Sequence, residues 1–257
     1  MHRALEQVDF GAARLQDELA SALIAAGGIA GAAALECEPE VAAAGLASAL
    51  ATPLRGSLGD LRLTGVSRAD RLDELEFELP LAGGETPTGT VAVRSIADLL
   101  DEFVAADDPL AGYAERLREP ALGSVLRGYL VGVIDLALRV RGADGRVGYA
   151  VIDYKTNFLG TPGEPLTAWQ YRPEALALAM QRSDYVLQGL LYSVALHRYL
   201  RWRVPGYDSD TDLLGIHYLF LRGMLGSGAG SGVFSWRAPT GLVPALSDLL
   251  AGESRTT

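Results

Sequence analysis

The sequence predicts an α/β fold, in which a β-sheet is flanked by helices and preceded by an additional helical segment. Three apolar, β-branched runs with the character of strands lie at 129–140, 147–154 and 213–221. Stretches with helical spacing of leucine and alanine lie before, between and after these runs. The 257 residues, 49% of them hydrophobic and 21% charged, are enough for one large core or two small ones.

The first segment, residues 1–52, is predicted to be helical because it is rich in alanine and leucine. We expect breaks near Phe10-Gly11 and Gly27-Gly28, since glycine weakens a helix interior. Glu38-Pro39 fits the start of a third helix, because proline is tolerated in a first helical turn.

Residues 72–79 alternate apolar and acidic side chains, which predicts a strand with one face in water. Residues 95–118 are predicted to be helical, in two pieces split near Asp107-Asp108-Pro109. Further along, 173–203 is predicted to be helical with a break at Arg182-Ser183-Asp184. The remaining predictions are a Gly/Ser loop at 224–232, a short strand at 233–236 and a closing helix at 242–250.

The runs at 129–140 and 147–154 flank a short Gly/Asp turn, which predicts a β-hairpin. If the turn centres on Asp144, paired residue numbers add up to 288, and Asp135 faces Asp153 with Cβ atoms about 5 Å apart. Because side chains alternate along a strand, Lys155 points to the same face as Asp153. The predicted polar face contains Val133, Asp135, Val151, Asp153 and Lys155, and the predicted buried face contains Ile134, Leu136, Ile152 and Tyr154.

Composition excludes several classes of site. Cys37 is the single cysteine, so neither an internal disulfide nor a cysteine-based zinc site is possible. No segment has the features of a signal peptide or the hydropathy of a membrane span, so we expect a cytoplasmic location. The net charge of −10 argues against a free-standing nucleic-acid binder, unless other chains of an assembly hold the nucleic acid.

Lys155 is the only lysine among 22 basic residues, and it ends the triplet Asp153-Tyr154-Lys155. Two carboxylates opposed across a hairpin repel each other, and a divalent cation with oxygen ligands removes that repulsion. Beside such an ion, Lys155 is placed to orient a water for attack on phosphorus, or to deprotonate it as the neutral amine. The alternative is a solvated strand face with an ordinary Asp153–Lys155 ion pair, and these residues alone leave both interpretations open.

Several ordered motifs resemble the RecB-type nuclease domain of the PD-(D/E)XK nucleases. The matching segments are 128–136, 153–157, 185–192, 195–201 and 218–223. The proline of the superfamily name is absent, since Ile134 precedes Asp135. The resemblance implies a restriction-endonuclease-like mixed sheet flanked by helices. It also implies a single domain over 1–257, with an N-terminal helical part (1–70), a nuclease core (71–223) and a loop, strand and helix at the end (224–257).

The resemblance further implies Mg²⁺-dependent hydrolysis of DNA phosphodiesters, with Mn²⁺ as a possible substitute and Ca²⁺ as a possible inhibitor. By position, Asp135 and Asp153 match the metal-binding and catalytic carboxylates, and Lys155 matches the catalytic ammonium. The backbone carbonyl of Tyr154 matches a further metal ligand. His2, in the first helix, matches the family's metal-ligating histidine.

Gln188 and Tyr192 match the family's Gln-x-x-x-Tyr motif, which implies a role in substrate binding. At this spacing they share one helical face, where an amide and a phenol could contact a phosphate or a base. Tyr185 lies beside them, and its simplest interpretation is a core-facing aromatic.

The implied activity is that of an exodeoxyribonuclease V in double-strand-break repair and homologous recombination. The implied partners are single-stranded DNA, the RecC and RecD subunits, and RecA. The chain begins inside the first helix of such a domain and carries no helicase motif, so we expect a detached part of a larger enzyme. Two alternatives remain. One is a non-cleaving docking module for RecA or RecC on the same fold. The other is an unrelated acidic α/β protein with an accidental triplet.

Overall fold

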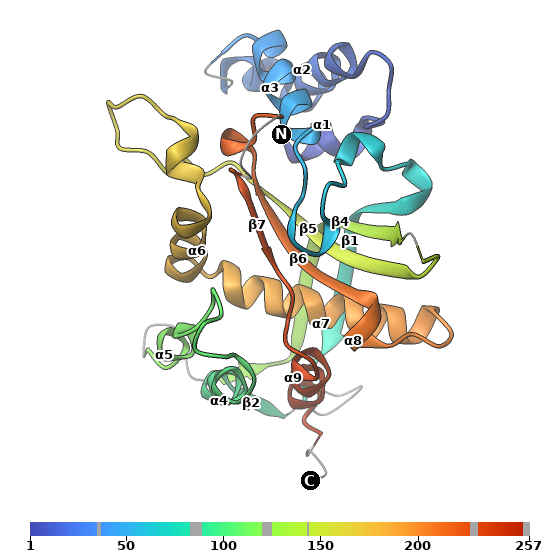
Figure 1. Cartoon of the computed structure of the whole chain (residues 1–257), viewed down its shortest axis with the longest axis vertical. Helices are drawn as coiled ribbons and strands as arrows, with labels where there is room; N and C mark the ends of the chain where they lie inside the picture. The colour runs from blue at the N-terminus through green and yellow to red at the C-terminus, as the bar shows by residue number, and fades with distance from the viewer. Residues whose placement is uncertain (35–36, 83–88, 120–124, 143, 227–230, 254–257) are drawn as a thin grey trace.

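The computed structural model describes residues 1–34, 37–82, 89–119, 125–142, 144–226 and 231–253. Its centre is a five-stranded mixed sheet in the order β1-β4-β5-β6-β7, with helices on both faces (Figure 1). The strands are β1 (Arg71–Pro80), β4 (Tyr129–Arg141), β5 (Val147–Lys155), β6 (Leu213–Phe220) and β7 (Val233–Trp236). Strands β5 and β6 are parallel, and the other neighbours are antiparallel. The predicted restriction-endonuclease-like fold class is confirmed.

One face of the sheet is covered by the N-terminal helices α1 (His2–Gln7), α2 (Leu15–Ala34) and α3 (Pro39–Leu50), which lie at the top of Figure 1. Their buried leucines and alanines pack against β4, β5 and β6 through Leu136, Ile152 and their neighbours. Helix α3 begins at Pro39 as predicted. The predicted break at Gly27-Gly28 is wrong, because α2 continues through it. Glycine costs only about 1 kcal/mol in a helix interior, and the surrounding alanines favour helix.

The opposite face is covered by α7 (Tyr185–Arg203), which crosses the sheet in Figure 1. The helices α4 (Val93–Phe103), α5 (Tyr113–Leu117), α6 (Pro173–Arg182), α8 (Ser209–Asp212) and α9 (Leu242–Ala251) surround it. The predicted splits between α4 and α5 and between α6 and α7 are confirmed. A small second sheet of β2 (Thr90–Ala92) and β3 (Val125–Arg127) was not predicted, because three-residue strands give little periodic signal.

The predicted hairpin register is confirmed from Leu136–Ile152 to Arg141–Val147, where paired numbers add up to 288. Ala143 in the predicted turn and residues 227–230 of the predicted Gly/Ser loop lie outside the described residues. Within the described part of the chain, no helix is both long and apolar enough to cross a membrane.

The sheet is irregular where β4 reaches Asp135. Cα pairing between β4 and β5 ends one step before Asp135 and Asp153 would face each other. On the other side, pairing with β1 skips Glu74, whose φ of 50° is left-handed. Ile134 consequently packs in the core on the α7 side, and the prediction that it shares a face with Leu136 is wrong. Departures from regular strand geometry of this kind gather at functional sites.

Candidate active site

Asp135 lies at the point where β4 and β5 separate. Its Oδ2 accepts a hydrogen bond of 2.8 Å from the backbone N–H of Tyr154. A side-chain acceptor therefore takes the place of the next backbone bond of the ladder. Tyr154 itself is buried among the N-terminal helices, so its ring fixes the end of β5 and its peptide group stays beside Asp135.

His2 is held over the same peptide. Its Nε2 lies 3.0 Å from the carbonyl oxygen of Tyr154 and 3.5 Å from Oδ2 of Asp135. Helix α1 brings the imidazole there, because Ala4 and Leu5 bury the inner face of the helix against the core. The structure thus brings His2 to Asp135 and the Tyr154 carbonyl, although His2 is more than a hundred positions from either in the sequence.

Asp153 and Lys155 form a buried ion pair on the α7 side of β5. The Lys155 Nζ lies 2.5 Å from Oδ2 of Asp153, and the two side chains are 12% and 3% exposed. Burial raises the pKa of Asp153 to about 6, and the nearby Asp135 charge acts in the same direction. Lys155 opposes this shift. The predicted placement of both residues on one face is confirmed.

Gln188 ties Lys155 to helix α7. Its Oε1 accepts hydrogen bonds from Lys155 Nζ at 3.1 Å and from the Tyr218 hydroxyl at 3.2 Å. Its Nε2 donates to the hydroxyl of Tyr192 at 3.0 Å. Burial raises the pKa of Tyr192 to about 12, so this phenol stays protonated at neutral pH. The predicted Gln188–Tyr192 pair is therefore hydrogen-bonded internally and contacts the Lys155 ammonium, and its role in substrate binding stays a prediction.

Two aromatic rings complete the surroundings of Lys155. Its Nζ lies 4.2 Å from the ring centroid of Tyr185 and 5.1 Å from that of Tyr218, and these two rings stack on each other. A cation over aromatic faces is stabilised electrostatically. Tyr185 also exchanges hydrogen bonds with the side chain of Asn157. The simplest sequence interpretation of Tyr185, a core aromatic, missed this contact because it depends on how α7 crosses the sheet.

Glu74 is a further carboxylate near Asp135, and the alternating pattern of 72–79 predicted only that it lies on the solvated face of a strand. Burial raises its pKa, and the charges of Glu6 and Asp135 add to the shift. The positive φ of Glu74 is the local signal that distinguishes it from Glu76 and Glu78. A backbone angle of this kind leaves no trace in the alternating pattern of the sequence.

The residues present fit a small divalent ion. Among the described residues, no three His, Cys, Asp or Glu side chains gather into a metal cluster by themselves. The donors that converge are the His2 imidazole, the Tyr154 carbonyl at 3.0 Å from it and the Asp135 carboxylate at 3.5 Å from it. Neighbouring ligands on an octahedral ion with bonds of about 2.1 Å lie about 3 Å apart. The third donor is thus the backbone oxygen of Tyr154, which a search for side-chain ligands alone does not include.

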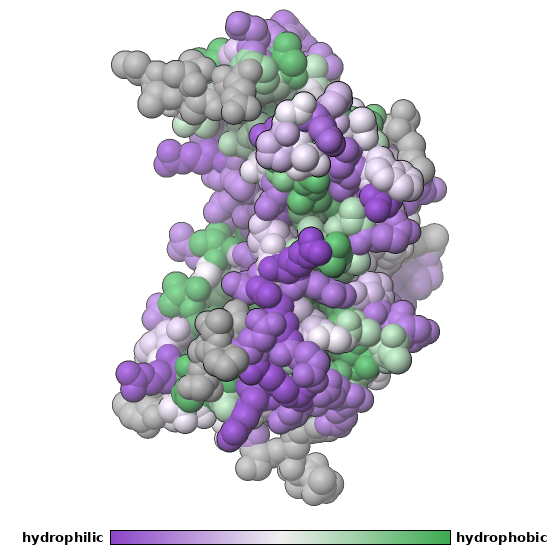
Figure 2. All heavy atoms as spheres, turned by 90° about the vertical axis from the view of Figure 1, so that its left-hand side faces the viewer, coloured by the Kyte–Doolittle hydropathy of each residue, from purple (hydrophilic) through white to green (hydrophobic). Residues whose placement is uncertain are grey.

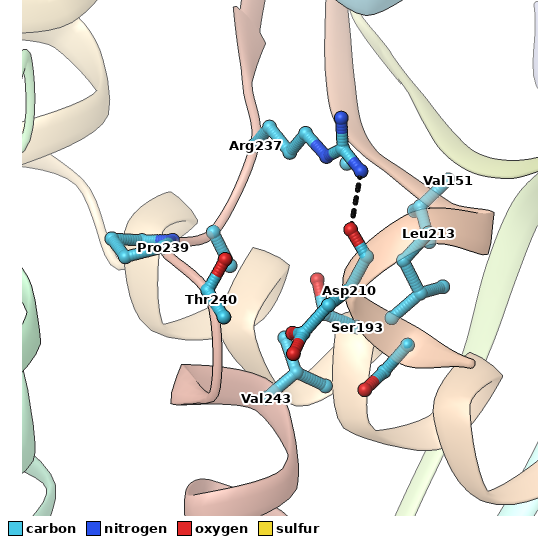
Figure 3. Close-up of a pocket in the computed structure, with 11 residues that line it drawn as sticks. Val151, Ser193, Asp210, Leu213, Arg237, Pro239, Thr240 and Val243 are labelled. Carbon is cyan, nitrogen blue, oxygen red and sulfur yellow. Dashed lines mark hydrogen bonds between the residues drawn. The ribbon is translucent and has the colours of Figure 1, made fainter.

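A pocket of about 320 Å³ lies elsewhere, between α7, α8, the start of β6, the segment after β7 and the start of α9 (Figure 3). Its wall includes Arg237, which donates a hydrogen bond of 2.7 Å to the backbone oxygen of Asp210. Val151, Leu213 and Val243 line it as well. It shares no residue with the site around Lys155, so we assign it no part in the chemistry.

Comparisons with known proteins decide the family. A protein of Mycolicibacterium smegmatis named RecBCD enzyme subunit RecB is 48% identical over 227 residues, which cover 84% of this chain. Its namesake in Mycobacterium tuberculosis is 47% identical over 77% of the chain, and that of Escherichia coli is 34% identical over 74%. The chain belongs to the RecB family. The RecB relatives are much longer, and the matched regions are 20%, 18% and 14% of their lengths. No family model matches the chain.

Proposed function

We propose that this chain is a Mg²⁺-dependent deoxyribonuclease domain of a RecB protein. The observation that carries the proposal is the meeting of two sets of groups at the end of β5. On one side His2, Asp135 and the Tyr154 carbonyl form a nitrogen and oxygen donor set. On the other side Asp153 and Gln188 fix the ammonium of Lys155.

A divalent ion bound by His2, Asp135, Asp153 and the Tyr154 carbonyl would supply water activation and charge stabilisation. The protein's own groups do the rest. Asp153 and Gln188 hold the Lys155 ammonium, so that it can orient the attacking water and donate to a non-bridging phosphate oxygen. The water loses a proton to solvent as its oxygen bonds to phosphorus, the bond from phosphorus to the leaving oxygen breaks, and that oxygen takes up a proton from solvent.

We propose DNA, mainly single-stranded, as the substrate, and an exodeoxyribonuclease activity within a RecBCD-type assembly of the cytoplasm. The relatives' name supports RecC and RecD as partners. The net charge of −10 also supports this arrangement, because an acidic chain gains from partners that hold and deliver the strand. Roles in double-strand-break repair and homologous recombination, and contact with RecA, belong to the same proposal. Mn²⁺ is expected to substitute for Mg²⁺, and Ca²⁺ to inhibit.

The test is cleavage of end-labelled single-stranded DNA by the purified chain, with Mg²⁺ and with EDTA. Asp153→Ala and Lys155→Ala should each abolish cutting while the fold is retained. Lys155→Arg should also fail, because a planar guanidinium cannot take the position of a compact ammonium. Asp98→Ala, an exposed carboxylate on α4, is the matched control and should cut like the parent.

Cutting that survives in Asp153→Ala and Lys155→Ala would contradict the mechanism. If the folded parent binds Mg²⁺ but does not cut even with RecC and RecD present, the non-cleaving docking module becomes the better description. The Asp153→Ala variant separates the nuclease from the docking module. Cleavage by a nuclease should require the Asp153 carboxylate, whereas partner binding by a docking module should not.

A further inference from the structure

Two exposed aromatic side chains lie on the loop that follows Lys155, between β5 and α6. Phe158, three residues after Lys155, is 47% exposed, and Trp169, on the 3₁₀ turn η5 (Ala168–Tyr171), is 69% exposed. Three residues of extended chain span at most about 10 Å, so the backbone of Phe158 lies within that distance of the backbone of Lys155. Each ring presents a large apolar surface to water.

The base of this loop is firmly fixed. The buried Tyr171 donates a hydrogen bond of 2.7 Å from its hydroxyl to the carbonyl of Asn157 and accepts one from the N–H of Leu159. Arg222 donates to the carbonyl of Thr156 at 2.9 Å. The Asn157 side chain is bonded to Tyr185, whose ring contacts Lys155. The loop is therefore connected directly to the catalytic groups.

The two rings are themselves held in place. A capping box of Thr167 and Gln170 fixes the turn that carries Trp169. The guanidinium of Arg172 lies 4.2 Å from the Trp169 ring centroid and donates to the Trp169 carbonyl at 2.9 Å. Phe158 packs against Gly160, where a Cβ would come within 2.9 Å of its ring. Phe158, Trp169 and Arg172 are named the aromatic platform below.

In Figure 1 the loop projects from the body beside α6, and Figure 2 views the molecule from that side. Hydrophobic and strongly hydrophilic residues lie next to each other on this face. Ring faces beside arginine are the combination that binds single-stranded nucleic acid, because bases stack on the rings while the cations attract phosphates. An apolar protein partner would not need the cation that covers one face of Trp169.

We infer that the aromatic platform binds the bases of single-stranded DNA and leads the strand to Lys155. The inference rests on the proposed function, and it adds residues to substrate binding that the Gln188 network does not provide. Duplex DNA fits the platform poorly, because its bases are already stacked on each other and present no free faces. The platform thus selects single strands at the entrance to the site.

The test measures binding of fluorescent oligo(dT) to the chain in EDTA, where no cutting occurs. Trp169→Ala should weaken binding about tenfold, since a base–aromatic stack contributes about that factor or more. Trp169→Phe, which keeps a ring, should bind nearly like the parent. Adding Phe158→Ala to Trp169→Ala should multiply the losses if the two rings bind successive bases.

Trp202→Ala is the matched control. Trp202 is 74% exposed and carries Arg203 at 4.0 Å from its ring, but it lies at the far end of α7. Fourteen helical residues separate it from Gln188, a distance of about 21 Å. Its loss should leave binding unchanged. Intrinsic tryptophan fluorescence adds a second readout, because quenching by oligo(dT) should persist in Trp202→Phe and disappear in Trp169→Phe.

An oligomer of the same length without bases separates stacking from phosphate contacts, and Trp169→Ala should not weaken its binding. Unchanged oligo(dT) binding by Trp169→Ala, or equal losses for the oligomer without bases, would overturn the inference and point to a protein contact. No oligo(dT) binding by the parent would also overturn it. Binding with Trp169 quenching in a chain that never cuts would support the platform and reject the nuclease proposal.

Discussion

Among the single side chains of the site, Asp153 is the one whose pKa shift has the largest predicted consequence. It is almost fully buried, and burial together with the Asp135 charge raises its pKa from 3.8 to about 6. The carboxylate must lose its proton before it can bind a cation, so proton and metal compete for it. At neutral pH the group is ionised and held mainly by Lys155 at 2.5 Å.

Metal affinity should therefore fall when the pH is lowered through 6. Below that value each pH unit should cost about tenfold in apparent Mn²⁺ affinity, because one proton must be displaced from Asp153. Binding measured by electron paramagnetic resonance of free Mn²⁺ between pH 7.5 and 5 would show this slope. Asp153→Asn should bind weakly at every pH and lose this part of the slope. A parent affinity that stays constant down to pH 5 would contradict the prediction.

Gln188 gives a second prediction at this scale. Its amide oxygen is occupied by Lys155 and Tyr218, so its main effect is on the position of the ammonium. Gln188→Met should lower kcat about ten- to a hundredfold, as loss of a supporting contact typically does, and leave KM nearly unchanged. Steady-state cleavage kinetics distinguish this from direct substrate binding. A large rise in KM at constant kcat would show that Gln188 binds the strand instead.

At the residue scale, spacing predicted how some of the residues singled out by the resemblance lie relative to one another. The alternation of β5 placed Asp153 and Lys155 on one face, and the i, i+4 rule placed Gln188 beside Tyr192. What could not be predicted was the hydrogen bond from Tyr154 to Asp135, because it forms where the ladder ends. Contacts of Lys155 with Tyr185 and Tyr218 depend on the crossing of α7, which no local pattern encodes.

At the scale of elements, helix α1 is the part of the site that depends most on tertiary contacts for its stability. Six residues are too few for a stable helix in water, so its contacts must hold it. Arg71, buried on β1, donates a hydrogen bond of 2.6 Å to the carbonyl of Val8 and lies 3.7 Å from the ring centroid of Phe10. These contacts fix the end of α1, and through it the position of His2.

Arg71→Lys should therefore weaken metal binding while the sheet stays folded. A lysine keeps the charge beside Asp73 but lacks the planar fork that reaches Val8. We expect a three- to tenfold fall in Mn²⁺ affinity, measured by titration calorimetry, with an unchanged far-UV circular dichroism spectrum. Arg139→Lys is the control, because Arg139 pairs with Asp70 just before β1 and not with the end of α1. Equal affinity in Arg71→Lys and the parent would contradict the role of Arg71.

Most elements could be predicted because their periods are long and regular. The hairpin, the two helix splits and the closing helix all have clear apolar patterns and turn residues. Failures have local causes: α2 continues through Gly27-Gly28 because the alanines around it outweigh two glycines. Ile134 turns to the other core because the strand is irregular at Asp135 and Glu74.

At the scale of the whole molecule, each core contains a buried histidine. His197 on α7 contacts the Tyr207 hydroxyl, and His217 on β6 contacts Ser57 on the opposite side of the sheet. Burial lowers the pKa of both from 6.5 to about 4. Their lowered pKa values favour the folded state above pH 6.5, and this contribution is lost as the pH falls toward 4.

Asp153 acts in the opposite direction, since its raised pKa favours the folded state at low pH and this contribution is lost as the pH rises through 6. When the pH is lowered from 7 to 4.5, each histidine should lower the free energy of unfolding by about 2 kcal/mol, and Asp153 should raise it by about 2 kcal/mol. The net expectation is a loss of about 2 kcal/mol, shared between the two cores.

Urea unfolding at pH 7 and pH 4.5, followed by circular dichroism, tests this balance. His217→Gln keeps a hydrogen-bonding group near Ser57 and should cancel most of the net loss, whereas Asp153→Asn should roughly double it. A single transition at both pH values would also support the prediction of one domain, because the two histidines lie in different cores. If His217→Gln loses as much stability on acidification as the parent, the buried histidine is not the source. If Asp153→Asn lessens the loss, the assigned direction of the Asp153 pKa shift is wrong.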